Sequence, residues 1–170
     1  MVESKKAMKE IIDKISSYNL FNYLFPGVLF AVLLEEHTHY TVLPEEIVLA
    51  LFVCYFLGLV ISRIGSLVIE PTLKLLNIIQ FAPYEDFILA SKSEPKLSLL
   101  SEANNMYRTL CALFVSLGIA ILFEWLTSSY KFIHNAAPFL LFITLTGLFV
   151  LSYRKQTMFI TKRVKATTKE

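Results

Sequence analysis

Two arginines occupy positions from which they could recognise an anion at a membrane surface, and a glutamate shares a helical face with one of them. Arg63 and Glu70 are seven residues apart, which places them on roughly one helical face, two turns apart. Arg108 follows a polar segment that opens another helix at the same membrane level. Guanidinium groups bind carboxylates and phosphates through two parallel hydrogen bonds. The candidate inner-interface polar cluster comprises Ser62, Arg63, Glu70, Asn105, Tyr107 and Arg108.

This cluster has two interpretations that the sequence leaves open. In the first, it is an ion-pair and hydrogen-bond network that pins the loop between two helices, aided by lipid headgroups. In the second, the arginines hold an anionic ligand or partner. Asn104 or Asn105 can also cap the helix that follows, because a side-chain oxygen there accepts an unpaired helix N–H.

Catalytic motifs are missing from the chain. It contains no HExxH, no GxSxG, no glycine-rich phosphate loop and no cysteine pair at ligand spacing. His37 and His39 lie beside two glutamates and could bind a metal weakly, although a solvated acidic loop is the alternative. Cys54 and Cys111 fall inside apolar runs, which favours packing over chemistry. The sequence therefore predicts a non-enzyme without catalytic, cofactor-binding or metal-binding residues.

Four apolar stretches must position the polar cluster. They cover residues 20–34, 47–61, 109–123 and 137–153, in a chain that is 55% apolar. Each run is shorter than the roughly 20 residues that cross a bilayer. The case for spanning therefore depends on the whole set and on the polar flanks that extend each helix.

Basic residues lie almost entirely on one side of these stretches. In the two outer loops, 35–46 and 124–136, the only lysine or arginine is Lys131. The other basic residues fall in the N-terminal segment, the central loop and its flanks, or the tail. Under the positive-inside rule, this bias predicts a multi-pass protein of the bacterial inner membrane with both termini in the cytoplasm. No span has a charge near its middle, which counts against ion-coupled transport.

The predicted fold is an all-α integral membrane protein with four transmembrane helices, an N-terminal amphipathic interfacial helix and a cytosolic helical loop between spans two and three. Residues 1–170 form one membrane domain. Met8, Ile11, Ile12 and Ile15 recur at helical spacing among lysines, which indicates the interfacial helix. The predicted segments are the interfacial helix 1–17, the spans 18–36, 46–69, 106–126 and 137–157, the loop 70–105 and the basic tail 158–170.

Two local features bear on helix packing. Pro26 and Gly27 lie inside the first span, where proline frees the carbonyl of Asn22 and predicts a kink, with a gating hinge as the alternative. The second span carries small residues at three- and four-residue steps, which lets membrane helices approach closely. This packing face could serve either the chain's own bundle or a subunit interface. Its residues are Gly58, Ser62, Gly65 and Ser66.

Several strings in the chain resemble a known group of proteins. They read YFLG at 55–58, SRIGS at 62–66, EP at 70–71 and SEANNMYRT at 101–109. In these strings the chain resembles a family of small, largely uncharacterised bacterial four-span inner-membrane proteins, from about Asn19 to the third helix. The resemblance implies an association with antiviral defence, either as effectors that disturb the membrane or as sensors coupled to a cytosolic partner.

The function expected from these observations is a non-enzymatic inner-membrane component. We expect a homo-oligomer in the lipid bilayer, coupled to a cytosolic protein through residues 70–107. A small channel or carrier that acts without a partner is the first alternative, and a membrane scaffold or assembly factor is the second. Nucleic acid is not an expected partner, because no basic stripe interleaves with aromatic residues.

Overall fold

The computed structural model describes residues 19–94 and 96–167, and every regular element in those ranges is a helix. The predicted interfacial helix over 1–17 lies outside the described residues. The elements are η1 (Leu20–Leu24), α2 (Phe25–His37), α3 (Ile47–Ile64), η2 (Gly65–Ile69), α4 (Glu70–Leu75), α5 (Tyr84–Ser93), α6 (Lys96–Ser129) and α7 (Lys131–Thr167). The two η elements are π-helical turns, in which the backbone hydrogen bonds reach back five residues.

Three helices are long and apolar enough to cross a bilayer. They are Ile47–Leu75, Lys96–Ser129 and Asn135–Ala166, and their lengths and compositions are those of a membrane protein. The first predicted span, 18–36, is not among them. It corresponds to η1 with 5 residues and α2 with 13, a combined length of about 27 Å at the α-helical rise. Asn22, Glu35 and Glu36 also dilute its apolar character.

The helices extend beyond the predicted boundaries of the spans. The second continues to Leu75, so the connection to α5 begins later than residue 70. The third begins at Lys96 rather than 106, and α7 covers most of the predicted tail. The apolar runs mark only the part of each helix that suits lipid, whereas Glu, Lys and Gln continue a helix readily into water.

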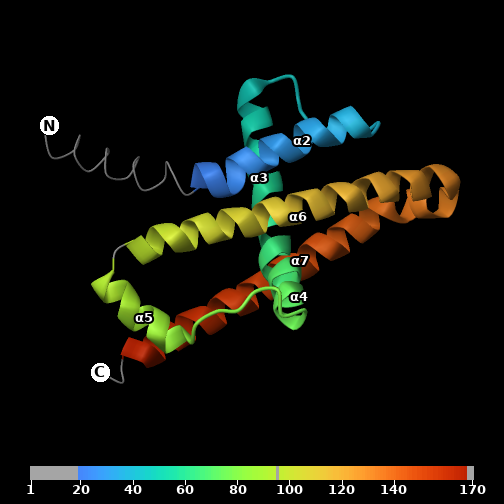
Figure 1. Ribbon diagram of the computed structural model, residues 1–170. Coiled ribbons are helices and arrows are strands. Elements are labelled where there is room, and N and C mark those ends of the chain that lie inside the picture. The colour runs from blue at the N-terminus through green and yellow to red at the C-terminus, as the bar shows by residue number, and fades with distance from the viewer. Residues whose placement is uncertain (1–18, 95, 168–170) are drawn as a thin grey trace, which may run out of the picture.

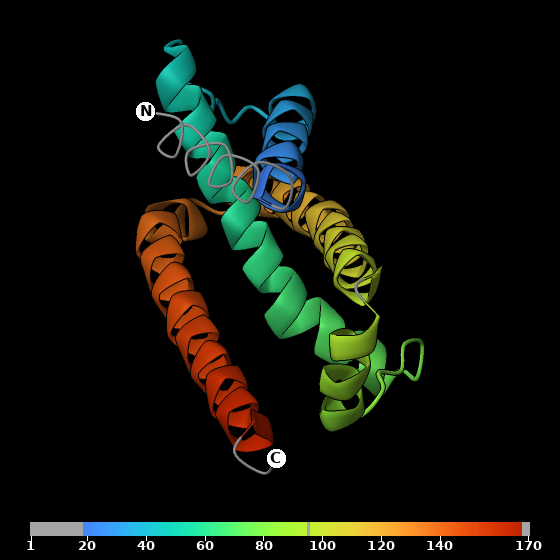
Figure 2. The ribbon, with the colours of Figure 1, turned by 90° about the vertical axis from the view of Figure 1, so that its left-hand side faces the viewer.

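Figure 1 shows α6 and α7 as an antiparallel hairpin that turns at Tyr130, with the long α3–η2–α4 helix crossing both. Helix α2 lies along α6, and α5 lies near the start of α6 and the end of α7. Figure 2 shows that α3 and α7 run in a similar direction. The start of α6 and the ends of α4 and α7 therefore lie toward the same end of the molecule as α5.

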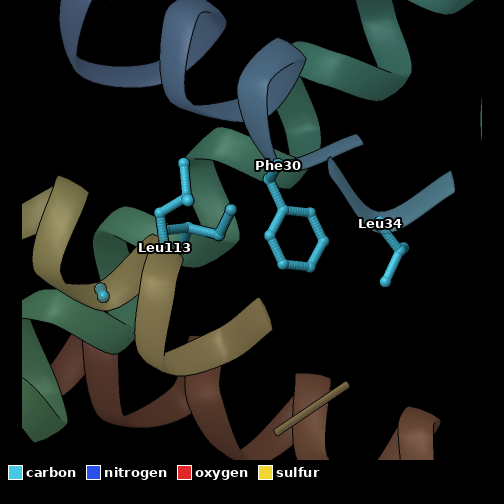
Figure 3. Close-up of a cluster of buried hydrophobic side chains, with 5 residues drawn as sticks. Phe30, Leu34 and Leu113 are labelled. Carbon is cyan, nitrogen blue, oxygen red and sulfur yellow. The ribbon is translucent and has the colours of Figure 1, made fainter. Parts of the chain in front are cut away.

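The apolar core is small and lies where α2, α3 and α6 cross (Figure 3). Its buried side chains are Phe30, Leu34, Ile61, Ala112 and Leu113. None of the described side chains of α7 is buried, and most large apolar side chains elsewhere are exposed. Such a surface suits lipid, which is as apolar as the side chains themselves.

Glycines allow the first two helices to touch through their backbones. A Cβ atom at Gly58 would lie 1.7 Å from the carbonyl oxygen of Tyr23, and one at Gly27 would lie 1.7 Å from that of Cys54. No side chain fits at either position without separating the helices. The contact between η1–α2 and α3 therefore depends on two glycines. Gly58 of α3 faces the backbone of η1, and Gly27 of α2 faces the backbone of α3.

A π turn stands where the sequence predicts a kink at Pro26. Phe25 N–H donates to the carbonyl of Leu20, five residues back, and Pro26 then occupies the first turn of α2. In this register the carbonyl that faces the proline nitrogen belongs to Phe21 instead of Asn22. The π turn thus absorbs the missing hydrogen bond ahead of a position where proline is well tolerated.

Candidate functional site

The candidate site is centred on the carboxylate of Glu70, at the first position of α4. Arg108 Nη1 of α6 lies 2.8 Å from Glu70 Oε2, and Lys74 Nζ lies 2.9 Å from Oε1. Lys155 Nζ of α7 approaches Oε1 at 3.7 Å. Three cations from three helices therefore surround one carboxylate whose side chain is 12% exposed. We call Glu70, Lys74, Arg108 and Lys155 the Glu70 network.

Lys155 also binds a backbone carbonyl of η2, and the proline that follows η2 explains why this carbonyl needs a donor. Glu70 N–H donates to the carbonyl of Gly65, which sets the five-residue register of this π turn. In the same register, the carbonyl of Ser66 would face the nitrogen of Pro71, which carries no hydrogen. Lys155 Nζ donates to that carbonyl at 2.6 Å and to Ser66 Oγ at 2.8 Å. The lysine thus supplies a donor that the helix lacks.

A buried polar cluster lies next to the Glu70 network, around the hydroxyl of Thr109, the residue that follows Arg108 on α6. Thr109 Oγ1 donates to the carbonyl of Asn105 at 2.9 Å, and it lies 3.4 Å from Ser62 Oγ and 3.2 Å from Asn22 Oδ1. Thr109, Asn22 and Ser62 are each less than 4% exposed. Buried polar groups are costly unless paired. The cluster therefore fixes how η1, α3 and α6 meet.

Arg63 bonds to Tyr23, and the ion pairs of Glu70 among the described residues are with other cations, which differs from the predicted grouping. Its Nη2 donates to Tyr23 Oη at 3.2 Å. The predicted grouping assumed an unbroken α-helix between positions 63 and 70, whereas η2 intervenes and changes the angular spacing of the residues. Tyr107 is 64% exposed and lies at the periphery. Asn105 joins through its backbone carbonyl.

The small-residue face of α3 and η2 is occupied by the chain itself. Gly58 meets the backbone of η1, and a Cβ at Gly65 would lie 3.2 Å from the carbonyl oxygen of Arg108 on α6. Ser62 faces Thr109 of α6, and Ser66 faces Lys155 of α7. Of the two uses that the sequence leaves open for this face, the structure shows the intramolecular one. Self-assembly would need another surface.

The opposite ends of the helices are joined by a second set of contacts. The backbone N–H of His39 donates to Glu124 Oε1 at 2.6 Å, and Tyr40 Oη lies 3.4 Å from Thr127 Oγ1. Glu35 accepts two backbone N–H groups of the same loop. Within 19–94 and 96–167, no three His, Cys, Asp or Glu residues gather as a metal site would require.

A cavity of about 550 Å³ opens beside the Glu70 network. Its apolar wall comes from α5, the start of α6, the end of α7 and the segment before α5. Its polar side includes Glu70, Lys74, Arg108 and Lys162. The residues of the apolar wall are Phe81, Ala82, Tyr84, Phe87, Leu97, Leu100 and Phe159.

Sequence reasoning did not identify Lys155, Thr109, Asn22 and Tyr23 as members of the site. A signal for Lys155 was present, because Pro71 inside a membrane helix must leave a carbonyl in need of a donor. The donor itself lies 89 residues away from Ser66 and could not be chosen from the sequence.

Comparisons of the chain with protein-family models, curated proteins and solved structures found no match. The family resemblance, the homo-oligomer and the antiviral setting therefore stay predictions from the sequence.

Proposed function

We propose that the chain is a non-enzymatic four-span protein of the bacterial inner membrane that couples a cytosolic signal or partner to a movement of α7. In this topology both termini and the connection between α4 and α6 lie in the cytoplasm. Two observations support it. The basic residues are concentrated on that side, and His39–Glu124 and the Glu70 network join the helices at opposite ends.

The observation that carries the proposal is the way Lys155 attaches α7. None of the described side chains of this helix is buried, so it lacks the packing that holds α3 and α6 together. Lys155 reaches the carbonyl of Ser66 and the carboxylate of Glu70 from a half-buried position. Elements with few buried contacts are the ones that move at low free-energy cost. Lys155 acts as a latch that keeps α7 against η2 and α4.

The cytosolic input reaches this latch through α5. The ring of Tyr84, the first residue of α5, lies 6.4 Å from the ring of Phe159 on α7, centroid to centroid. Phe159 is one helical turn beyond Lys155, so a partner that displaces α5 also acts on the latch. The helix α5 carries Glu85 and Asp86 in its first turn and Lys92 in its last, which gives it a polar surface for such a partner.

The test is membrane potential in bacteria after controlled induction, read with a voltage-sensitive dye. Lys155→Met removes the latch, so α7 is expected to move and open a leak that depolarises the cells without any partner, whereas the wild-type chain does not depolarise them. Arg154→Met is the matched control, because it removes a positive charge from the neighbouring, exposed position. If the membrane potential is unchanged with Lys155→Met, at verified membrane expression, the proposal that α7 controls a membrane effector is contradicted.

A further inference from the structure

The cavity beside the Glu70 network combines an aromatic and aliphatic wall with an excess of positive charge. Lys74, Arg108 and Lys162 line it, and Glu70 is the only acidic residue among its described lining residues. That carboxylate already pairs with Lys74 and Arg108 and lies 3.7 Å from Lys155. Among the described residues that line the cavity, one negative side chain therefore stands against three positive ones, so the cavity carries an excess of positive charge.

Arg108 lines the cavity while it holds Glu70. Its Nη1 donates to Glu70 Oε2, and the guanidinium group has five N–H donors in all. Hydrogen bonds from guanidinium and ammonium groups to phosphate are strong and charge-assisted. Lys162 is exposed at the rim, so it can meet a phosphate without a rearrangement of the helices.

The rest of the cavity fits an apolar chain. Phe81 and Phe87 form one part of the wall, Leu97 and Leu100 a second, and Phe159 a third. The volume of about 550 Å³ lies within the range of small-molecule sites. The cavity is formed at the ends of the long helices, where the proposed topology places the inner leaflet.

We propose that this cavity holds one anionic phospholipid, with its phosphate at Lys74, Arg108 and Lys162 and the first part of an acyl chain along the apolar wall. This assignment deepens the proposed function, because the lipid would join α5, α6 and α7 beside the Lys155 latch. It depends on the inner leaflet lying at this end of the helices. A phospholipid supplies both the anion and the apolar chain that the two sides of the cavity require.

The experiment is native mass spectrometry of the purified full-length chain after reconstitution in nanodiscs of phosphatidylglycerol and phosphatidylethanolamine. Wild type is expected to retain a single phosphatidylglycerol. Leu100→Trp fills the cavity and is expected to abolish retention. Leu99→Trp is its matched control, because Leu99 and Leu100 are 66% and 63% exposed and Leu99 does not line the cavity.

A second pair of variants tests the headgroup. Lys162→Gln is expected to lower retention by about fivefold, the effect of one basic residue near a charged surface, whereas Arg154→Gln should leave it unchanged. Three outcomes overturn the proposal. The first is that Lys162→Gln retains as much phosphatidylglycerol as wild type, and the second is that Leu100→Trp retains as much as Leu99→Trp. The third is that wild type retains phosphatidylethanolamine as well as phosphatidylglycerol. Displacement of the lipid by inorganic phosphate alone also overturns it, because a free anion would then be sufficient. Retention is measured on the purified chain, so its failure is separate from a failure of the depolarisation test.

Discussion

Lys155 Nζ lies 2.6 Å from the carbonyl oxygen of Ser66, a backbone group for which the proline at position 71 offers no N–H. The long helix α3–η2–α4 is thus incomplete by one hydrogen-bond donor, and a lysine from α7 supplies it. In lipid an unpaired carbonyl is costly, so this contact couples the integrity of one helix to the position of another.

Replacing Pro71 with alanine should reduce the dependence on Lys155. Alanine has the backbone N–H that proline lacks, and this N–H can donate to the carbonyl of Ser66 within the same helix. Lys155→Met lowers the free energy of unfolding in both backgrounds, and we expect the loss to be smaller by about 1–3 kcal/mol in the Pro71→Ala background than in the wild-type background. Thermal unfolding in detergent, followed by the fluorescence of the single tryptophan, measures this. An equal loss in both backgrounds would mean that Lys155 does not serve this carbonyl.

The glycine contact between η1 and α3 should tolerate no side chain. In Gly58→Ala the new methyl group would overlap the backbone of Tyr23, and its only escape is to separate the helices. Overpacking of this kind costs about 1–3 kcal/mol or more. Gly118→Ala is the control, because a Cβ there meets nothing within 4 Å. Similar melting temperatures for the two variants would contradict the close approach.

These contacts show what the sequence could and could not predict. The apolar runs indicate where helices lie, because lipid and core both demand apolar side chains. They do not indicate where helices end, so α6 and α7 extend beyond the predicted spans. Arg63 was grouped with Glu70 by α-helical periodicity, which the π turn η2 breaks. Both described π turns end two residues before a proline, Pro26 or Pro71, but a proline alone does not specify whether the helix answers with a π turn, a kink or a break.

The buried cluster around Thr109 should depend on its hydroxyl group. Thr109→Val keeps the shape of the side chain and leaves Asn22 and Ser62 facing a methyl group. The loss should be about 1–3 kcal/mol of unfolding free energy, the cost of buried polar groups left unpaired. Thr161→Val is the matched control, because its hydroxyl is exposed and bonds only to its own helix. A change below about 0.5 kcal/mol in Thr109→Val, the range of surface substitutions, would show that the cluster contributes little.

Arg63 should be energetically coupled to Tyr23 and independent of Glu70. A double-mutant cycle of Arg63→Gln with Tyr23→Phe is expected to give an interaction energy of about 0.5 kcal/mol or more, since the two groups are hydrogen-bonded. The cycle of Arg63→Gln with Glu70→Gln should be additive. The reverse pattern would restore the grouping inferred from α-helical spacing.

The most direct test of the latch is the distance between α4 and α7, measured by double electron–electron resonance in nanodiscs. Spin labels at Leu75→Cys and Ile160→Cys occupy exposed positions, in a Cys54→Ala, Cys111→Ala background. We expect one narrow distance distribution in the otherwise wild-type chain and with Arg154→Met, and a broader, longer one with Lys155→Met. Identical distributions for Lys155→Met and wild type would show that Lys155 does not hold α7 in place.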